Sequence, residues 1–203
     1  MDCYSGCTRA MNLQYLQKEI NSCLPILIVG HRRADELAQV FNQVREISPS
    51  QLFLAMDGPR TIDEESLTNA ARSIAMNSIN WDCEVHRLFS PINRGCREFM
   101  LEAISWFFEN VDEGIVLEDD ILIHTDFPKF ASRLLANPSV GIVSACTHAE
   151  ILGPNFYEPA FFSHIPSIWG WACTSNVWKS FLSQQDNRPS ELHRMVFQLA
   201  KRV

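Results

Sequence analysis

Three adjacent carboxylates, Glu118, Asp119 and Asp120, interrupt a segment that is otherwise apolar. The run Gly-Ile-Val-Leu precedes them and the run Ile-Leu-Ile follows them. Three unpaired carboxylates would repel each other and would be costly to bury, so a cation must lie beside them. An arginine could supply that charge, or a hard divalent ion such as Mg²⁺ or Mn²⁺, which binds one or two protein carboxylates together with phosphate and water. The triplet therefore favours a metal–diphosphate site, although an acidic pair after a strand is also typical of a helix cap or a solvated turn.

Basic and polar residues gather at other points where strands are expected to end or helices to begin. They form three groups: His31, Arg32 and Arg33; Asp57 and Arg60; and Asn93, Arg94 and Arg97. Arginines from these groups could offset the three carboxylates or could bind a diphosphate. A simpler interpretation is also open, in which residues 57–59 form only a turn and Arg94 and Arg97 are exposed residues at the start of a helix.

Alternating strands and helices must position these groups. Strands are expected at residues 24–29, 52–56, 83–89, 114–120 and 140–146. Helices are expected within residues 34–47, 62–79, 93–111 and 128–138, with a short one near residues 11–20. This order predicts an α/β fold with a mostly parallel sheet and helices on both faces. Ligands of such sheets bind beyond the carboxyl ends of the strands, and the three groups and the triplet are expected to lie at that rim.

The length and composition fit one domain. The 203 residues are predicted to form a variable lead-in at residues 1–23 and one domain at residues 24–203. A formal net charge of −7 disfavours a nucleic-acid-binding surface. The seven cysteines include no CxxC pair, so we expect reduced thiols in a cytoplasmic protein. No signal peptide is expected, and no apolar run approaches the roughly 20 residues of a membrane span, so we expect no transmembrane segment.

Five short motifs stand in order along the chain. They are Asp57–Arg60 (DGPR), Trp81–Val85 (W-x-C-x-V), Asn93–Cys96 (N-x-G-C), Glu118–Asp120 (EDD) and Trp169–Ala172 (WGWA). With these motifs, residues 24–180 resemble nucleotide-diphospho-sugar transferases of the GT-A fold, in particular bacterial glycosyltransferases. The segments Glu118–Phe127 and Val143–Ala145 are also similar to segments of the N-acetylglucosaminyltransferases that act on N-glycans.

The resemblance implies a metal-dependent glycosyltransferase with a GT-A, Rossmann-like fold. Its donor would be a nucleotide-diphosphate sugar, with a UDP-sugar as the first expectation, and its acceptor a saccharide or glycan. Mn²⁺ or Mg²⁺ would be the cofactor, with Asp120 as the direct metal ligand. Donor-binding roles are implied for His31, Arg32, Asp57, Arg94, Arg97, Glu118 and Asp119. Trp169 and Trp171 would shape the pocket for the sugar and the acceptor, unless they are core residues of a strand.

Relatives of this kind continue for tens of residues beyond the WGWA segment. That tail supplies acceptor-binding elements and, in inverting enzymes, a carboxylate that acts as the general base. The chain ends at Val203, so the acceptor side is expected to be truncated, and the catalytic base is unknown. Asp186, Glu191 and, upstream, Glu150 are candidates for it, but none matches the expected motif.

Two alternatives to an active glycosyltransferase stay open. The first is a non-catalytic or truncated domain that binds a nucleotide sugar, which a turnover assay would distinguish. The second is a nucleotidyltransferase, which also uses acidic residues and a metal on a parallel sheet. We rank the nucleotidyltransferase last because it predicts a glycine-rich phosphate loop, whereas residues 29–36 contain one glycine.

Overall fold

The structure is a computed structural model that describes residues 9–10, 23–146, 161–163 and 166–185. Along the chain the elements are β1 (Arg9–Ala10), β2 (Ile26–Gly30), α1 (Ala34–Ile47), β3 (Gln51–Met56), the 3-10 helix η2 (Ile62–Glu64), α2 (Glu65–Asn77), β4 (Glu84–Phe89), α3 (Cys96–Asn110), β5 (Glu113–Glu118), α4 (Phe127–Leu135), β6 (Ile142–Ser144), β7 (Phe161–Phe162), β8 (Trp171–Thr174) and α6 (Ser175–Gln185).

Six strands of the described residues form one sheet, in the order β4-β3-β2-β5-β8-β6. The four strands β4, β3, β2 and β5 are mutually parallel, whereas β8 runs antiparallel to both of its neighbours, β5 and β6. A separate two-stranded antiparallel sheet pairs β1 with β7. The mostly parallel sheet predicted from the sequence is therefore confirmed.

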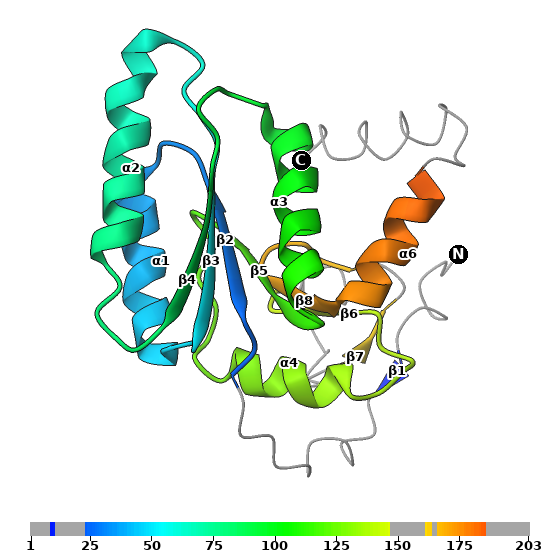
Figure 1. Ribbon diagram of the computed structural model, residues 1–203. Coiled ribbons are helices and arrows are strands. Elements are labelled where there is room, and N and C mark those ends of the chain that lie inside the picture. The colour runs from blue at the N-terminus through cyan, green and yellow to red at the C-terminus, as the bar shows by residue number, and fades with distance from the viewer. Residues whose placement is uncertain (1–8, 11–22, 147–160, 164–165, 186–203) are drawn as a thin grey trace, which may run out of the picture.

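Two hydrophobic clusters cover the two faces of the large sheet. Alternate residues of β2 divide between them, since Ile26 and Ile28 pack in one cluster and Leu27 and Val29 in the other. Helices α1, α2 and α4 contribute to the first cluster, and α3 and α6 contribute to the second. Figure 1 shows α1 and α2 on one side of the sheet and α3 and α6 on the other. Burial on both faces explains why β2 and β3 are continuous apolar runs.

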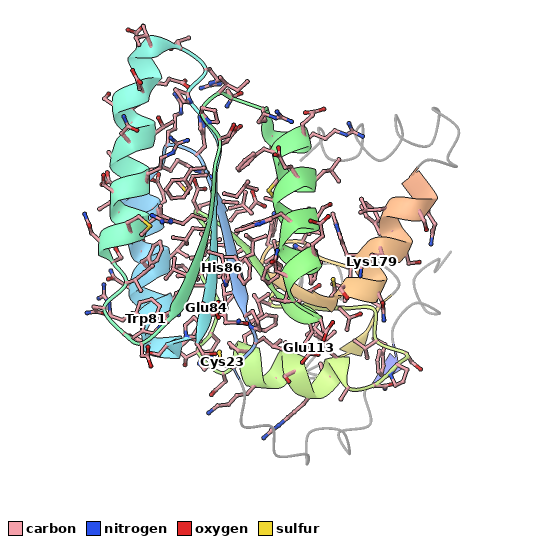
Figure 2. The ribbon with its side chains drawn as sticks, viewed as in Figure 1. Cys23, Trp81, Glu84, His86, Glu113 and Lys179 are labelled. Atoms are coloured by element: carbon pink, nitrogen blue, oxygen red, sulfur yellow. The ribbon has the colours of Figure 1, made fainter. Side chains whose placement is uncertain are left out.

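The order of the strands creates a topological switch point between β2 and β5, which is the place where the chain changes the side of the sheet to which it adds strands. From β2 the chain passes through α1 to β3 on one side, and from β4 it passes through α3 to β5 on the other side. Figure 2 places Cys23, which lies three residues before β2, and Glu84 and Glu113, the first residues of β4 and β5, at the lower edge of the sheet. The carboxyl ends of these strands therefore lie at the upper edge, which is where sheets with such a switch point bind ligands.

Several boundaries differ from those expected from the sequence. The helix expected within residues 62–79 begins as the 3-10 helix η2 before it continues as α2. The strand order, which was not predicted, places β8, from the WGWA segment, between β5 and β6 and antiparallel to both. The short helix expected near residues 11–20 falls outside the described residues. Within the described part of the chain, no helix is both long enough and apolar enough to span a membrane.

Candidate functional site

The carboxylates at the end of β5 are paired with an arginine from the loop after β2. Arg33 Nη1 lies 2.6 Å from Asp120 Oδ2, and Arg33 Nη2 pairs with Asp119 Oδ1. Asp119 is buried, whereas the side chains of Arg33 and Asp120 are 45% and 39% exposed. One face of this ion-pair cluster is therefore buried against the sheet, and the other is open to a ligand.

Asp119 also fixes the backbone at the end of β2. Its Oδ2 accepts a hydrogen bond of 3.2 Å from the backbone N–H of His31. A Cβ atom on Gly30 would lie 3.1 Å from Asp119 Cβ and 3.2 Å from Asp119 Oδ2, so a side chain at this position would require Asp119 to shift. Asp119 therefore holds the β2 and β5 ends together.

Glu118 is the half-buried last residue of β5, and its carboxyl has a raised pKa. Burial is the largest cause, and the neighbouring charges of Asp120 and Asp119 raise the pKa further, while Arg33 lowers it. An added cation beside this group would oppose all three causes of the rise, because it favours the ionised carboxylate. The end of β5 is thus an electrostatic environment that favours a positively charged ligand.

Asp57 braces the loop that leads into α3. Its Oδ1 accepts hydrogen bonds from the backbone N–H groups of Gly58 at 2.8 Å and Arg94 at 2.9 Å. Its Oδ2 accepts from Asn93 Nδ2 at 2.9 Å and from the backbone N–H of Gly95 at 3.2 Å. Asp57 is 5% exposed, so these internal donors use the oxygens that a nucleotide would otherwise contact. The arrangement indicates that Asp57 positions the loop, and its expected direct contact with the donor stays a prediction.

His31 links the loop after β2 to the same turn. Its Nε2 lies 2.8 Å from the carbonyl oxygen of Gly58, and Asn93 Nδ2 donates to that carbonyl at 3.0 Å. A Cβ atom on Gly58 would come within 2.4 Å of the backbone of Ile92, so the turn and the loop before α3 touch backbone to backbone. The loops after β2, β3 and β4 are therefore packed as one unit at the carboxyl edge of the sheet.

Glu64, for which no role was predicted from the sequence, forms ion pairs with two arginines at this edge of the sheet. Arg32 Nη1 lies 2.6 Å from Glu64 Oε1, and Arg60 Nη2 lies 2.5 Å from the same oxygen. The hydrogen bond from the Arg60 side chain lowers the pKa of Glu64 to about 2, and the charge of Arg32 contributes to the shift. Arg32, expected to bind the donor, is engaged with Glu64 in this structure.

The two arginines at the start of α3 pair with acidic residues of that helix. Arg94 Nε lies 3.4 Å from Glu102 Oε2, and Arg97 Nη1 lies 3.4 Å from Glu98 Oε1. The four side chains are between 41% and 60% exposed, so these contacts are weak in water. Both arginines can exchange these partners for an anionic ligand, and their donor-binding role stays a prediction.

The two tryptophans of the WGWA segment have different environments. Trp171, in β8, is 7% exposed and packs in the core with its ring 6.4 Å from that of Trp178. Trp169 is 48% exposed. Between them Gly170 has a φ of +69°, and a Cβ there would lie 2.9 Å from Ile123 Cγ2. The segment therefore packs directly on the chain that follows the three carboxylates.

Arg33 belongs to the basic residues expected at the rim, but no site role was predicted for it from the sequence. The adjacent Arg32 and Arg33 look equivalent in the sequence, yet one pairs with Glu64 and the other with Asp119 and Asp120. The direction of each side chain depends on the turn after β2, for which the sequence gives no signal. The base candidates Glu150 and Asp186, and Glu191, fall outside the described residues.

The donor atoms at the end of β5 fit a hard divalent cation. Carboxylate oxygens are the ligands that Mg²⁺ and Mn²⁺ prefer, and such ions need one or two of them when phosphate and water complete the shell. The guanidinium of Arg33 shows that Asp119 and Asp120 together already hold a cation. Among the residues described, no cluster of three or more His, Cys, Asp or Glu side chains is arranged around a common metal position. Asp120, the more exposed of the pair, is the residue that could contribute a metal ligand.

Comparison with solved structures shows what this fold resembles. The mannosyltransferase PcManGT from Pyrobaculum calidifontis, in complex with GDP-Man and Mn²⁺, matches with a TM-score of 0.52 and 17% identity, over 79% of this chain and 49% of that chain. The bifunctional glycosyltransferase WbbM, in its apo form, matches with a TM-score of 0.41 and 10% identity, over 84% of this chain and 34% of that chain. No protein-family model and no curated protein matches the sequence.

The chain therefore has a mixed α/β fold of the glycosyltransferase type, and the fold class predicted from the sequence is confirmed. It spans about half the length of the mannosyltransferase, at 49% of that chain.

Proposed function

We propose that this chain binds a nucleotide-diphosphate sugar together with a divalent metal and acts as a glycosyltransferase. The observation that carries the proposal is the meeting of Asp119, Asp120 and Arg33 at the switch point between β2 and β5. Oppositely charged groups stand there at the sheet edge where such folds bind nucleotides. The complex of the structurally similar mannosyltransferase with GDP-Man and Mn²⁺ supports the same class of ligand.

Each group at this edge has a task in the proposed reaction. Asp120 would hold the metal, and Asp119 would keep the β2 and β5 ends in place through the N–H of His31. When bound, the metal would stabilise the charge that develops on the leaving diphosphate. Glu118 would face the donor, and its half-buried carboxyl would be held ionised by the added positive charge.

The finer details rest on the sequence resemblance. We propose a UDP-sugar as donor, Mn²⁺ or Mg²⁺ as cofactor, and a saccharide or glycan as acceptor, as in the N-acetylglucosaminyltransferases that the EDD segment resembles. The exposed Trp169 lies on the segment that packs against the chain after Asp120, so its ring could stack on a sugar. We propose no base among the described residues.

A binding experiment tests the donor and metal roles separately from turnover. UDP-N-acetylglucosamine, GDP-mannose, UDP and GDP are titrated calorimetrically into the chain with and without Mn²⁺, for the wild type and for Asp120→Asn. We expect at least one of these ligands to bind with Mn²⁺ and to lose that metal dependence in Asp120→Asn. Asp82→Asn, in the exposed residue before β4, is the matched control and should bind as the wild type does. Failure of every ligand to bind at millimolar concentration would contradict the proposal, whereas binding without transfer in a turnover assay would indicate a non-catalytic domain.

A further inference from the structure

Arg33 is paired with Asp120, the residue that is proposed to bind the metal. Its two terminal nitrogens are divided between two carboxylates, with Nη1 on Asp120 Oδ2 at 2.6 Å and Nη2 on Asp119 Oδ1. This forked pairing uses the planar geometry of guanidinium, which an ammonium group cannot reproduce. The carboxylate that is best placed to bind a metal is therefore already paired with a cationic side chain of the same protein.

A metal at Asp120 and the guanidinium in its present place would disfavour each other. Both are cations, and both would contact the same carboxylate, so their mutual repulsion would add to the loss of the ion pair. Asp119 is held by a second donor, the N–H of His31, and is 2% exposed. Arg33, whose side chain is 45% exposed, has the freedom to leave. Metal binding at Asp120 therefore favours displacement of the arginine from this carboxylate.

A diphosphate offers the displaced arginine a new partner. Phosphate oxygens accept the same forked pair of hydrogen bonds as a carboxylate does, and they bring negative charge to the site together with the metal. Arg33 follows β2 by three residues, at the switch point where the nucleotide is proposed to bind. The guanidinium could thus exchange Asp120 for the diphosphate through a change of side-chain rotamer.

We propose that Arg33 is a resident counter-ion that competes with the divalent metal for Asp120 and is transferred to the diphosphate when the donor binds. This proposal rests on the proposed function. It makes metal binding weak in the absence of a nucleoside diphosphate, and it makes metal and nucleotide bind with positive coupling. By linkage the coupling is reciprocal, so the metal strengthens nucleotide binding by the same factor.

The test measures Mn²⁺ affinity directly, by the electron paramagnetic resonance signal of free Mn²⁺, without any turnover. The variants are wild type, Arg33→Gln and Arg33→Lys, each alone and with saturating UDP or GDP. Arg87→Gln is the matched control, because Arg87 is an exposed arginine of β4, three strands away from β5 in the sheet. It corrects for the general effect of removing one positive charge from the chain. A circular dichroism melt of each variant verifies that it is folded.

In Arg33→Gln we expect Mn²⁺ to bind more tightly than in the wild type when no nucleotide is present. The gain should be about twofold to thirtyfold, the range that corresponds to losing two partly exposed ion pairs. The enhancement of Mn²⁺ binding by the nucleotide should shrink in this variant, since Arg33 no longer has to be moved. The Mn²⁺ affinity of Arg33→Lys should lie between those of the wild type and Arg33→Gln, because lysine keeps the positive charge but cannot form the forked pair of hydrogen bonds.

Two outcomes would overturn the inference in distinguishable ways. If nucleotide-supported Mn²⁺ binding is present but Arg33→Gln and Arg87→Gln bind Mn²⁺ equally, the competition is absent and the proposed function stands. If Mn²⁺ binds to none of the variants, with or without nucleotide, the metal-dependent function fails and the competition fails with it.

Discussion

The ion pair between Arg33 and Asp119 joins the end of β2 to the end of β5 across 86 residues of sequence. Asp119 is buried and also accepts the N–H of His31, so the pair fixes the two strand ends that flank the switch point. Asp119, the buried residue of the acidic motif, therefore has a structural role. Its neighbour Asp120 is more exposed and is accessible to a ligand.

Replacing Asp119 by asparagine should destabilise the fold. The amide can still accept from His31, but it loses the charge that Arg33 pairs with, and one such charged hydrogen bond is worth about 1.5–3 kcal/mol. Because the side chain of Arg33 is 45% exposed, water screens this pair, and the expected loss in unfolding free energy is about 1 kcal/mol, below that range. Urea denaturation measures it as a lower midpoint at unchanged m-value. Asp120→Asn is the control and should lose less than about 1 kcal/mol, because its side chain is 39% exposed; equal losses would contradict the assignment.

Gly58→Ala should destabilise the loops at the carboxyl edge of the sheet. The added Cβ would lie 2.4 to 2.6 Å from backbone atoms of Ile92, and backbone cannot give way as a flexible side chain can. Overpacking of this kind typically costs about 1–3 kcal/mol. Gly141→Ala is the matched control, because a Cβ there meets nothing within 4 Å, and we expect it to be neutral or slightly stabilising. Thermal melts of the two variants compare them, and similar melting temperatures would show that the turn is not constrained as described.

The contact between Gly58 and Ile92 is one of several features of the fold that cannot be predicted from the sequence. The apolar runs of β2 and β3 and the helical period of α1 predict elements close to those observed, because burial on both faces of a sheet leaves a strong local pattern. The insertion of β8 between β5 and β6 leaves no such trace, since strand order depends on contacts between distant segments. The sequence placed Asp57 at the correct edge of the sheet. Its bonds to Asn93 and to the N–H groups of residues 94 and 95 depend on the loop conformation, which no residue pattern encodes.

The contribution of Glu64 to stability should depend on pH in a defined window. Its folded-state pKa is lowered from 4.5 to about 2, so the Glu64 carboxylate becomes protonated at a lower pH in the native state than in the unfolded state. The stabilisation is therefore fully present above the unfolded pKa and is lost as the pH falls from about 4.5 through about 2. The unfolding free energy of Glu64→Gln should accordingly be lower than that of the wild type at pH 7, and the two values should converge toward pH 2.

Denaturant titrations at several pH values and at low and high salt measure this convergence. The difference should also shrink at high salt, because the arginine partners are exposed and their charges are screened. Glu36→Gln, an exposed acid in the first turn of α1, is the control for loss of one negative charge. If the difference in unfolding free energy between wild type and Glu64→Gln does not depend on pH, the ion pairs of Glu64 with Arg32 and Arg60 are not its cause.

Substitutions of the two tryptophans of the WGWA segment should have different effects, with Trp171 mainly affecting stability and Trp169 mainly affecting sugar binding. Trp171 lies in the core against Trp178, so Trp171→Ala should cost about 3–5 kcal/mol of unfolding free energy, as is usual when a buried aromatic side chain is removed. Trp169 is 48% exposed, so Trp169→Ala should cost clearly less and leave the chain folded. If Trp169 stacks on the donor or acceptor sugar, Trp169→Ala should bind the nucleotide sugar more weakly while its affinity for the bare nucleoside diphosphate stays unchanged. Calorimetric titration of both ligands, with Trp169→Phe as the variant that keeps an aromatic face, measures this split, and equal weakening for both ligands would place Trp169 outside the sugar pocket.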